Sequence, residues 1–185
     1  MFARTERLLL RPGWAEDAPA LHQAIADERI VRNLASAPWP YRPEHAQAYA
    51  ATEREPGEPS VLLFRRTAGE PRLVGAIGIG RRPDDELELG YWIARPFWGL
   101  GYATEAGEAM LRFARHSLRL TRLRAGHFLD NPASGRVLRK LGFRPTGAIV
   151  DRFSVARGET APCKLFELDL AEETADVPTR ALVAA

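Results

Sequence analysis

The chain has 185 residues, of which 45% are hydrophobic and 27% are charged, as in ordinary globular proteins. Its 26 basic and 24 acidic residues leave a formal net charge of only +2, and the arginines are interspersed with acids, which argues against a nucleic-acid-binding protein. The longest aliphatic runs, at 8–10 and 61–64, are far shorter than the roughly 20 residues of a membrane span. Because residues 1–7 carry charges where a signal peptide needs apolar residues, we expect a cytoplasmic protein.

Residues that bind metals or form disulfides are sparse. The single cysteine, Cys163, excludes an internal disulfide and any multi-cysteine zinc site. The four histidines are His22, His45, His116 and His127, and no two of them have the spacing of paired ligands on a helix. We therefore expect no metal site.

The first part of the chain alternates between regular elements and a loop. Residues 5–11 are predicted to form a strand, and residues 15–29 an amphipathic helix. Three prolines within 37–43 remove backbone donors, so this stretch is predicted to be a loop. A short helix is predicted after it, from Glu44 to about Glu53.

The middle of the chain contains two predicted strands, at 60–66 and 72–80, that a short turn joins into a hairpin. Residues 86–93 alternate, so that Glu88 and Trp92 share one face of a further strand. A helix over about 103–118 follows.

The last elements are a strand at 121–129, a helix that Asn131 caps and Gly142 ends, and strands near 146–155 and 163–170. This order of strands and helices indicates a mixed α/β or α+β fold.

The most informative segment is the turn between the strand at 86–93 and the following helix, with small residues at Gly99, Gly101 and Ala103. Glycines let backbone amides approach a ligand, and a helix start adds unpaired N–H groups that suit a pyrophosphate. A tight strand-to-helix connection is the alternative explanation. The dinucleotide-binding fingerprint is not matched, because Thr104 stands where the third glycine belongs, and the P-loop motif is absent.

Three blocks of sequence resemble the GNAT N-acetyltransferases, and most closely the branch that includes the Rim-type ribosomal-protein N-terminal acetyltransferases. They are TERLLLRP at 5–12 followed by Asp17, the segments at 88–93 and 97–106, and NPASGRVLRKLGF at 131–143. The resemblance implies an α+β fold with a central, mixed, mostly antiparallel sheet of about seven strands, splayed at the cofactor site and flanked by helices.

The resemblance also implies the domain organisation and the activity. A single N-acetyltransferase domain would span 1–170, with a C-terminal tail at 171–185. This enzyme, a monomer or homodimer, would transfer an acetyl group directly from acetyl-CoA to a primary amine on a protein N-terminus or a small molecule. The alternative is a catalytically silent acyl-CoA-binding module.

Cofactor contacts are implied along one stretch of chain and at the start of the later helix. The backbone amides of the turn would hold the CoA pyrophosphate, and an amide at the end of the preceding strand would stabilise the developing oxyanion. Trp98 stands where the family pattern has Arg or Gln, which forfeits a side-chain phosphate contact. The expected cofactor-binding residues are Trp92, Ile93, Ala94, Trp98, Gly99, Leu100, Gly101, Tyr102, Ala103, Thr104, Asn131 and Ser134.

Two residues are implied as catalytic. An α-amine, with a pKa of about 8, is already partly neutral at cellular pH, so a water-relayed carboxylate is a sufficient base. Glu88 is the first candidate, Glu86 is the reserve, and either one could instead be a solvated strand carboxylate. Ser134 is expected to donate to the leaving thiolate, because Leu138 stands where many GNAT enzymes have a tyrosine.

The acceptor site is predicted from variable segments. Trp39 and Tyr41, in the proline-rich loop, are expected to line it together with Glu88, although an aromatic loop that anchors the core would explain both aromatic residues equally well. A second variable stretch, 151–162, contains Asp151, Arg152 and Glu159, which either contact a charged acceptor or are solvated.

Overall fold

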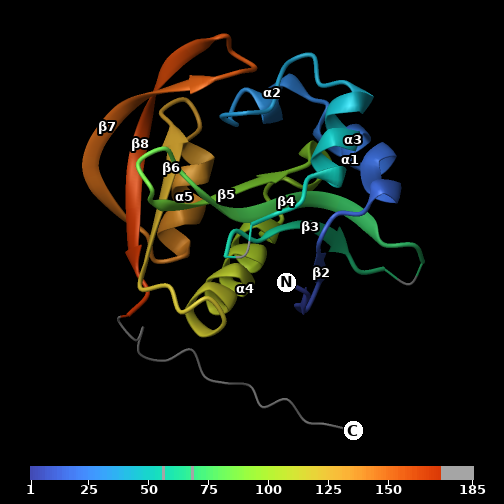
Figure 1. Cartoon of the computed structure of the whole chain (residues 1–185), viewed down its shortest axis with the longest axis horizontal. Helices are drawn as coiled ribbons and strands as arrows, with labels where there is room; N and C mark the ends of the chain where they lie inside the picture. Colours follow the sequence, from blue (N-terminus) through green and yellow to red (C-terminus); the bar gives the residue numbers. More distant parts are fainter. Residues whose placement is uncertain (56, 68, 172–185) are drawn as a thin grey trace, which may run out of the picture.

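The computed structural model describes residues 1–171, except residues 56 and 68, so the predicted tail at 171–185 lies outside the described residues apart from Ala171. Within this part of the chain, eight strands form one sheet in the spatial order β1-β2-β3-β4-β5-β6-β8-β7 (Figure 1). The strands are β1 Ala3–Arg4, β2 Leu8–Arg11, β3 Ser60–Arg65, β4 Arg72–Arg81, β5 Leu87–Ile93, β6 Arg122–Phe128, β7 Arg144–Ser154 and β8 Glu159–Asp169.

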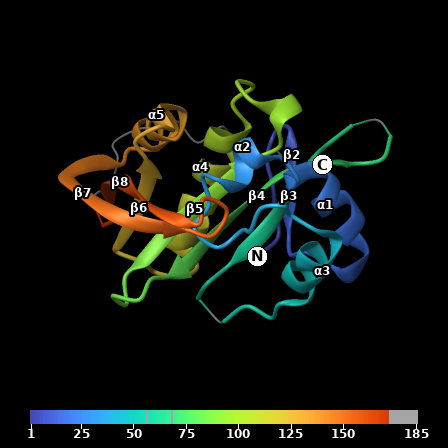
Figure 2. The same ribbon diagram turned by 90° about the horizontal axis from the view of Figure 1, so that it is seen from above.

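Helices cover both faces of the sheet. They are η1 Ala15–Asp17, α1 Ala18–Ile25, α2 Glu28–Val31, α3 Pro43–Ala51, η2 Arg95–Phe97, α4 Tyr102–His116 and α5 Pro132–Lys140. Viewed from above, the β7–β8 hairpin and α1 with α3 lie at opposite ends of the molecule (Figure 2). No helix in the described residues is both long and apolar enough to cross a bilayer.

Two hydrophobic cores hold these layers together. On one face, Met110 of α4 and Leu138 of α5 pack against Ile77 and Leu89 of the sheet. On the other face, the α1–α3 region packs against sheet residues that include Leu62. The alternation predicted for 86–93 is confirmed, because Leu89 enters the first core while Trp92 packs against the second.

The sheet opens between β5 and β6, which are its only parallel pair among the described strands. These strands are in register only at Glu88 with Arg124 and Leu89 with Ala125. Beyond that point they diverge, so residues 90–93 of β5 pair with β4 on one side and have an unpaired edge on the other. The expected splay of the sheet is therefore present.

The structure differs from the predicted elements in two respects. The sheet has eight strands rather than about seven, because the two-residue β1 pairs with β2. The helix predicted over 15–29 is broken into η1, α1 and α2, because the Asp27 side chain accepts a hydrogen bond from the Arg29 amide and caps a new helix. An internal capping residue therefore overrides the apolar periodicity of this stretch.

Candidate active site

The turn before α4 presents a row of backbone donors. Gly99 and Gly101 have φ values of +75° and +83°, which L side chains rarely adopt, and a Cβ built on Gly99 would meet no atom within 4 Å. The first intrahelical bond runs from the Glu105 amide to the Gly101 carbonyl at 3.1 Å. Among the described residues, the amides of 99–104 have no acceptor. These donors, at a helix N-terminus, fit the diphosphate of CoA.

Arg7 supports this turn from the strand side. Its Nη1 donates to the Leu100 carbonyl at 2.9 Å, and its guanidinium pairs with Glu105 at 2.7 Å. Burial alone would raise the pKa of Glu105, but hydrogen bonds from Thr5 and Arg7 outweigh it and lower that pKa. Sequence reasoning quoted Arg7 only as part of a family block. The structure places Arg7 beside the turn, where it is a cationic neighbour of the backbone donors.

Trp98 also contacts the unpaired edge of β5. Its indole Nε1 donates to the Ile93 carbonyl at 2.6 Å, while 48% of the side chain remains exposed. Ala94 is buried, and its amide is bonded to the Val74 carbonyl at 2.8 Å. The edge from Gly90 to Ile93 thus leads directly to the donor row, as an extended pantetheine chain requires.

The start of α5 faces β5 across the splay. Asn131 caps the helix by accepting from the Ser134 amide at 3.4 Å, and the Ser134 hydroxyl lies 2.8 Å from the Tyr91 hydroxyl. Burial raises the pKa of Tyr91 to about 12, so this phenol stays protonated at neutral pH. Leu138 is only 1% exposed and belongs to the core. Sequence reasoning did not assign Tyr91 a role, because strand alternation marked it only as core-facing.

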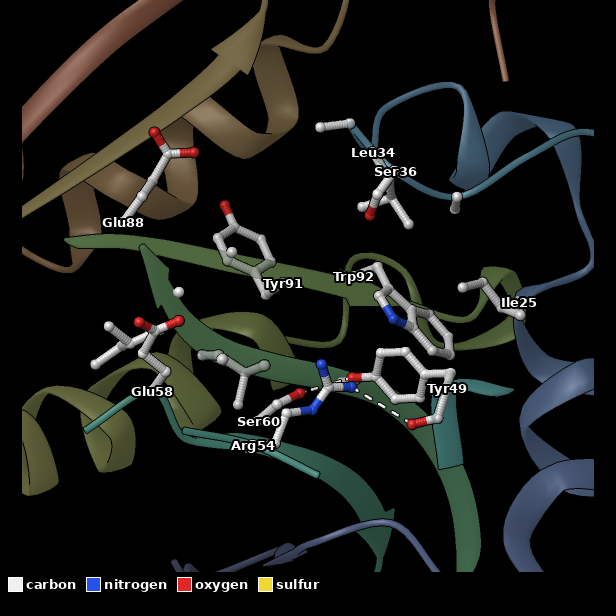
Figure 3. Close-up of a pocket in the computed structure, with 18 of the residues that line it drawn as sticks. Ile25, Leu34, Ser36, Tyr49, Arg54, Glu58, Ser60, Glu88, Tyr91 and Trp92 are labelled. Atoms are coloured by element: carbon white, nitrogen blue, oxygen red, sulfur yellow. Dashed lines mark hydrogen bonds between the residues drawn. The ribbon is translucent and has the colours of Figure 1, made fainter. Parts of the chain in front are cut away.

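A cavity of about 660 Å³ opens on the other face of the sheet. Figure 3 shows Glu88 at one end of this cavity, and Trp92 with Ile25 at the other. Its floor includes Gly80 and Gly90, where a Cβ would meet no atom within 4 Å, so bare backbone faces the cavity there.

The two aromatic residues predicted for the acceptor site lie in different surroundings. Tyr41 is buried and lines the cavity, whereas Trp39 is 42% exposed and is not among the lining residues. Tyr41 also packs in the core beside α1 and α3. The anchoring function that the sequence left open therefore applies to Tyr41.

The two carboxylates considered as bases have different partners. Glu86 pairs with Arg124 at 3.3 Å near the sheet surface. Glu88 faces the cavity and receives two hydrogen bonds from Arg152 of β7, at 2.7 and 2.5 Å. Of these two candidates, Glu88 is therefore the one that lies at the cavity and is held there by Arg152.

The β7–β8 hairpin closes over the same region by contacting the loop after α2. The Val155 amide donates to the Ala35 carbonyl at 3.0 Å, and the buried Ser154 hydroxyl donates to the Leu34 carbonyl at 2.9 Å. Arg157 binds Asp130 through two nitrogens. The Val155 and Ser154 contacts tie the hairpin to the loop after α2, and the Arg157–Asp130 pair ties it to the segment that follows β6.

Two further candidate residues, Cys163 and His127, are not among the residues that line the cavity. Cys163 is buried beside Arg152, and burial raises the pKa of its thiol. His127 packs between α5 and Phe166, with its ring 5.5 Å from the phenyl ring. In the described residues, no group of three or more histidines, cysteines or acids is arranged to hold a metal ion.

Comparison with known proteins gives consistent matches over most of the chain. Residues 7–144 match the family model described as the acetyltransferase (GNAT) domain. The uncharacterized N-acetyltransferase YoaA of Bacillus subtilis (strain 168) is 30% identical over 152 residues, which cover 78% of this chain and 84% of YoaA.

Solved structures share the fold at lower identity. A GNAT-family acetyltransferase from Bacillus anthracis has a TM-score of 0.78 at 23% identity, covering 93% of this chain and all of the other. The ribosomal L7/L12 α-N-protein acetyltransferase RimL, in complex with coenzyme A, has a TM-score of 0.71 at 19% identity, covering 91% and 98%. The Vibrio cholerae spermidine N-acetyltransferase, in complex with CoA and spermine, has a TM-score of 0.72 at 18% identity, covering 90% and 97%.

Proposed function

This chain belongs to the GNAT family and is an N-acetyltransferase, and we propose that it moves the acetyl group of acetyl-CoA directly to a primary amine. One observation carries this proposal. The unpaired edge of β5 begins at the cavity that contains Glu88 and ends at the free backbone donors of 99–104. Donor and acceptor substrates can therefore meet at one strand.

Binding of the donor substrate is assigned to backbone groups. Acetyl-CoA supplies a thioester whose acetyl carbon is open to attack by an amine. The amides of 99–104 would hold the diphosphate, and the edge over Gly90–Ile93 would bind the pantetheine arm like an added strand. The Ile93 amide would stabilise the negative charge that develops on the carbonyl oxygen, because it lies on the unpaired edge whereas the Ala94 amide is bonded to the Val74 carbonyl.

Glu88 is assigned as the base, acting through a water molecule. A side chain that removes a proton from the attacking amine must lie in the acceptor cavity, and Glu88 lines it. Because an α-amine has a pKa of about 8, a carboxylate and correct positioning are enough for a fraction of neutral amine to react.

Ser134 and Tyr91 are assigned to the leaving thiolate. A thiol has a pKa of about 8.5, well below the value of about 12 for Tyr91, so the phenol is too weak an acid to give up its proton there. It instead orients the Ser134 hydroxyl, which donates a hydrogen bond to the sulfur while the thiolate leaves. Tyr91→Phe should lower kcat and leave CoA affinity unchanged.

The acceptor class is proposed as a protein N-terminus or a small polyamine-like molecule. RimL is named for an α-amino acceptor on L7/L12 and the Vibrio cholerae enzyme for spermidine, and the Rim-type sequence blocks favour the first class. The open cavity of about 660 Å³ suits either an extended peptide end or a slender amine.

A turnover assay tests the proposal. Release of free CoA thiol is measured with acetyl-CoA and three acceptors: a serine-initiated peptide, spermine and free lysine. The proposal predicts thiol release that depends on one of these amines, with Glu88→Gln slower by about 100-fold.

A catalytically silent acyl-CoA-binding module, the alternative considered from the sequence, is the result that would overturn the proposed transfer. It predicts acetyl-CoA binding by calorimetry without amine-dependent thiol release.

A further inference from the structure

Arg152 reaches Glu88 from the far end of the sheet. It lies on β7, the edge strand. Its side chain extends past β8 and β6, and its guanidinium binds Glu88 on β5. Both of its terminal nitrogens bind, one to each carboxylate oxygen, at 2.7 and 2.5 Å. The two side chains are only 17% and 14% exposed, so the contact is shielded from water.

The path of this side chain depends on a missing Cβ in β6. A Cβ built on Gly126 would lie 3.1 Å from Arg152 Nη1 and 2.9 Å from Cys163 Sγ. Both distances are shorter than ordinary van der Waals contacts. A Cβ at 126 would therefore crowd Cys163 and force the guanidinium to shift by a few tenths of an ångström.

The neighbouring charged side chain, Arg124, does not compete with Arg152 for Glu88. Arg124, which is next to Glu88 in the ladder, is bound to Asp84 at 3.0 Å and to Glu86 at 3.3 Å. A bidentate arginine leaves further lone pairs of the carboxylate free to accept from water or an amine.

We propose that Arg152 is a positioning residue that holds Glu88 in its reactive orientation, through the passage that Gly126 leaves open. This inference rests on the proposed role of Glu88 as base. The pairing has a second consequence for the acceptor. An unpaired carboxylate would stabilise the incoming amine as an ammonium ion, which cannot attack, whereas a neutralised ion pair does so far less.

Two other functions of Arg152 make different predictions. If it only ties the β7–β8 hairpin to the rest of the sheet, breaking another tie of that hairpin should have the same effect. The Arg157–Asp130 pair is such a tie, and it does not contact Glu88. If Arg152 instead binds a carboxylate of the acceptor, its loss should raise the acceptor KM and leave kcat unchanged.

The experiment compares Arg152→Met, Arg152→Lys, Glu88→Gln and the double variant Arg152→Met/Glu88→Gln, with Asp130→Asn as the matched control. Each is assayed for kcat and acceptor KM with the serine-initiated peptide and with spermine, and for CoA affinity by calorimetry. Removing Arg152 alone leaves a buried carboxylate unpaired and can destabilise the fold, whereas the double variant removes both charges together. Gly126→Ala is added as a further single variant, because it crowds the guanidinium without deleting it.

We expect Arg152→Met to lower kcat by about tenfold or more through misplacement of Glu88, and Gly126→Ala to lower kcat by a smaller factor. Acceptor KM and CoA affinity should stay within about twofold of wild type. Arg152→Lys should retain an intermediate kcat. The double variant should be no slower than Glu88→Gln, because Arg152 acts only through Glu88. In a further variant, Arg152→Ala, added guanidinium ion should partly restore kcat.

The outcomes separate this inference from the function on which it rests. Wild-type enzyme that is inactive on every amine, or Glu88→Gln with full activity, overturns the proposed function and this inference with it. A slow Glu88→Gln beside unimpaired Arg152→Met and Gly126→Ala overturns the positioning role alone. Three other results would also overturn the positioning role: an effect of Arg152→Met on acceptor KM only, an Asp130→Asn variant as slow as Arg152→Met, or a double variant much slower than Glu88→Gln.

Discussion

Replacing Gly101 by valine should release the donor row from its CoA-binding geometry. Gly101 is the residue that precedes α4, and its φ of +83° is a conformation that a β-branched residue avoids. The backbone must therefore rotate, and the amides that follow it lose their common direction. Gly147→Val is the matched control, because Gly147 has a similar φ of +87° on β7. A Cβ there would meet no atom within 4 Å, and a Cβ on Gly101 would make only an ordinary contact, 3.4 Å from Arg7 Nη2.

The size of the effect follows from the bonds that are lost. The left-handed conformation costs an L residue about 1–2 kcal/mol, so both variants should lose at least that much free energy of unfolding in urea. A hydrogen bond to a charged group contributes about 1.5–3 kcal/mol, so losing one at the donor row weakens CoA binding by about 10- to 100-fold. This second loss should occur in Gly101→Val alone.

Isothermal titration calorimetry with CoA measures the dissociation constants of the three proteins, after circular dichroism has shown that each is folded. Folded Gly101→Val with the CoA affinity of wild type would refute a diphosphate site at this turn. A Gly147→Val variant that is equally weakened would mean that the effect comes from general destabilisation.

Three further results are expected. The free energy of unfolding of wild type should fall as pH rises from about 10 to 12, because the folded protein keeps the Tyr91 proton (pKa about 12) after the unfolded chain has lost it. Urea titrations of Tyr91→Phe should show a shallower fall with pH. Equal slopes in the two proteins would contradict this. Gly90→Val should raise the acceptor KM several-fold, because it fills the cavity floor, and an unchanged KM would place the acceptor elsewhere. Gly107→Ala should lose about 1–3 kcal/mol of unfolding free energy in urea, because its Cβ would lie 2.5 Å from Leu141 Cδ1. Gly80→Ala, whose Cβ would meet no atom within 4 Å, should be near neutral. Equal unfolding free energies of the two variants would contradict this packing.

Local patterns in the sequence predicted the parts of the site that local geometry determines. The glycine turn before α4 and the Asn131 cap of α5 are set by neighbouring residues, and both are present as predicted. Alternation along 86–93 placed Glu88 and Trp92 on the cavity face, because successive side chains of a strand point to opposite faces.

Interactions between distant segments could not be predicted in the same way. Arg152 is 64 residues from Glu88 in sequence, and their contact depends on the strand order β6-β8-β7 and on the room left by Gly126. The bond between Tyr91 and Ser134 likewise requires the splay of β5 from β6. No spacing rule along the chain encodes either arrangement.

The most direct test of the binding mode is the amide NMR spectrum of the ¹⁵N-labelled protein during titration with CoA and, separately, with pantetheine, which lacks the diphosphate. Backbone N–H groups that grip phosphate oxygens should give large downfield shifts for 99–104 with CoA and none with pantetheine, while 90–93 respond to both. If the signals of 99–104 keep their ligand-free positions when CoA is bound, the diphosphate lies elsewhere and the assignment of this turn is wrong.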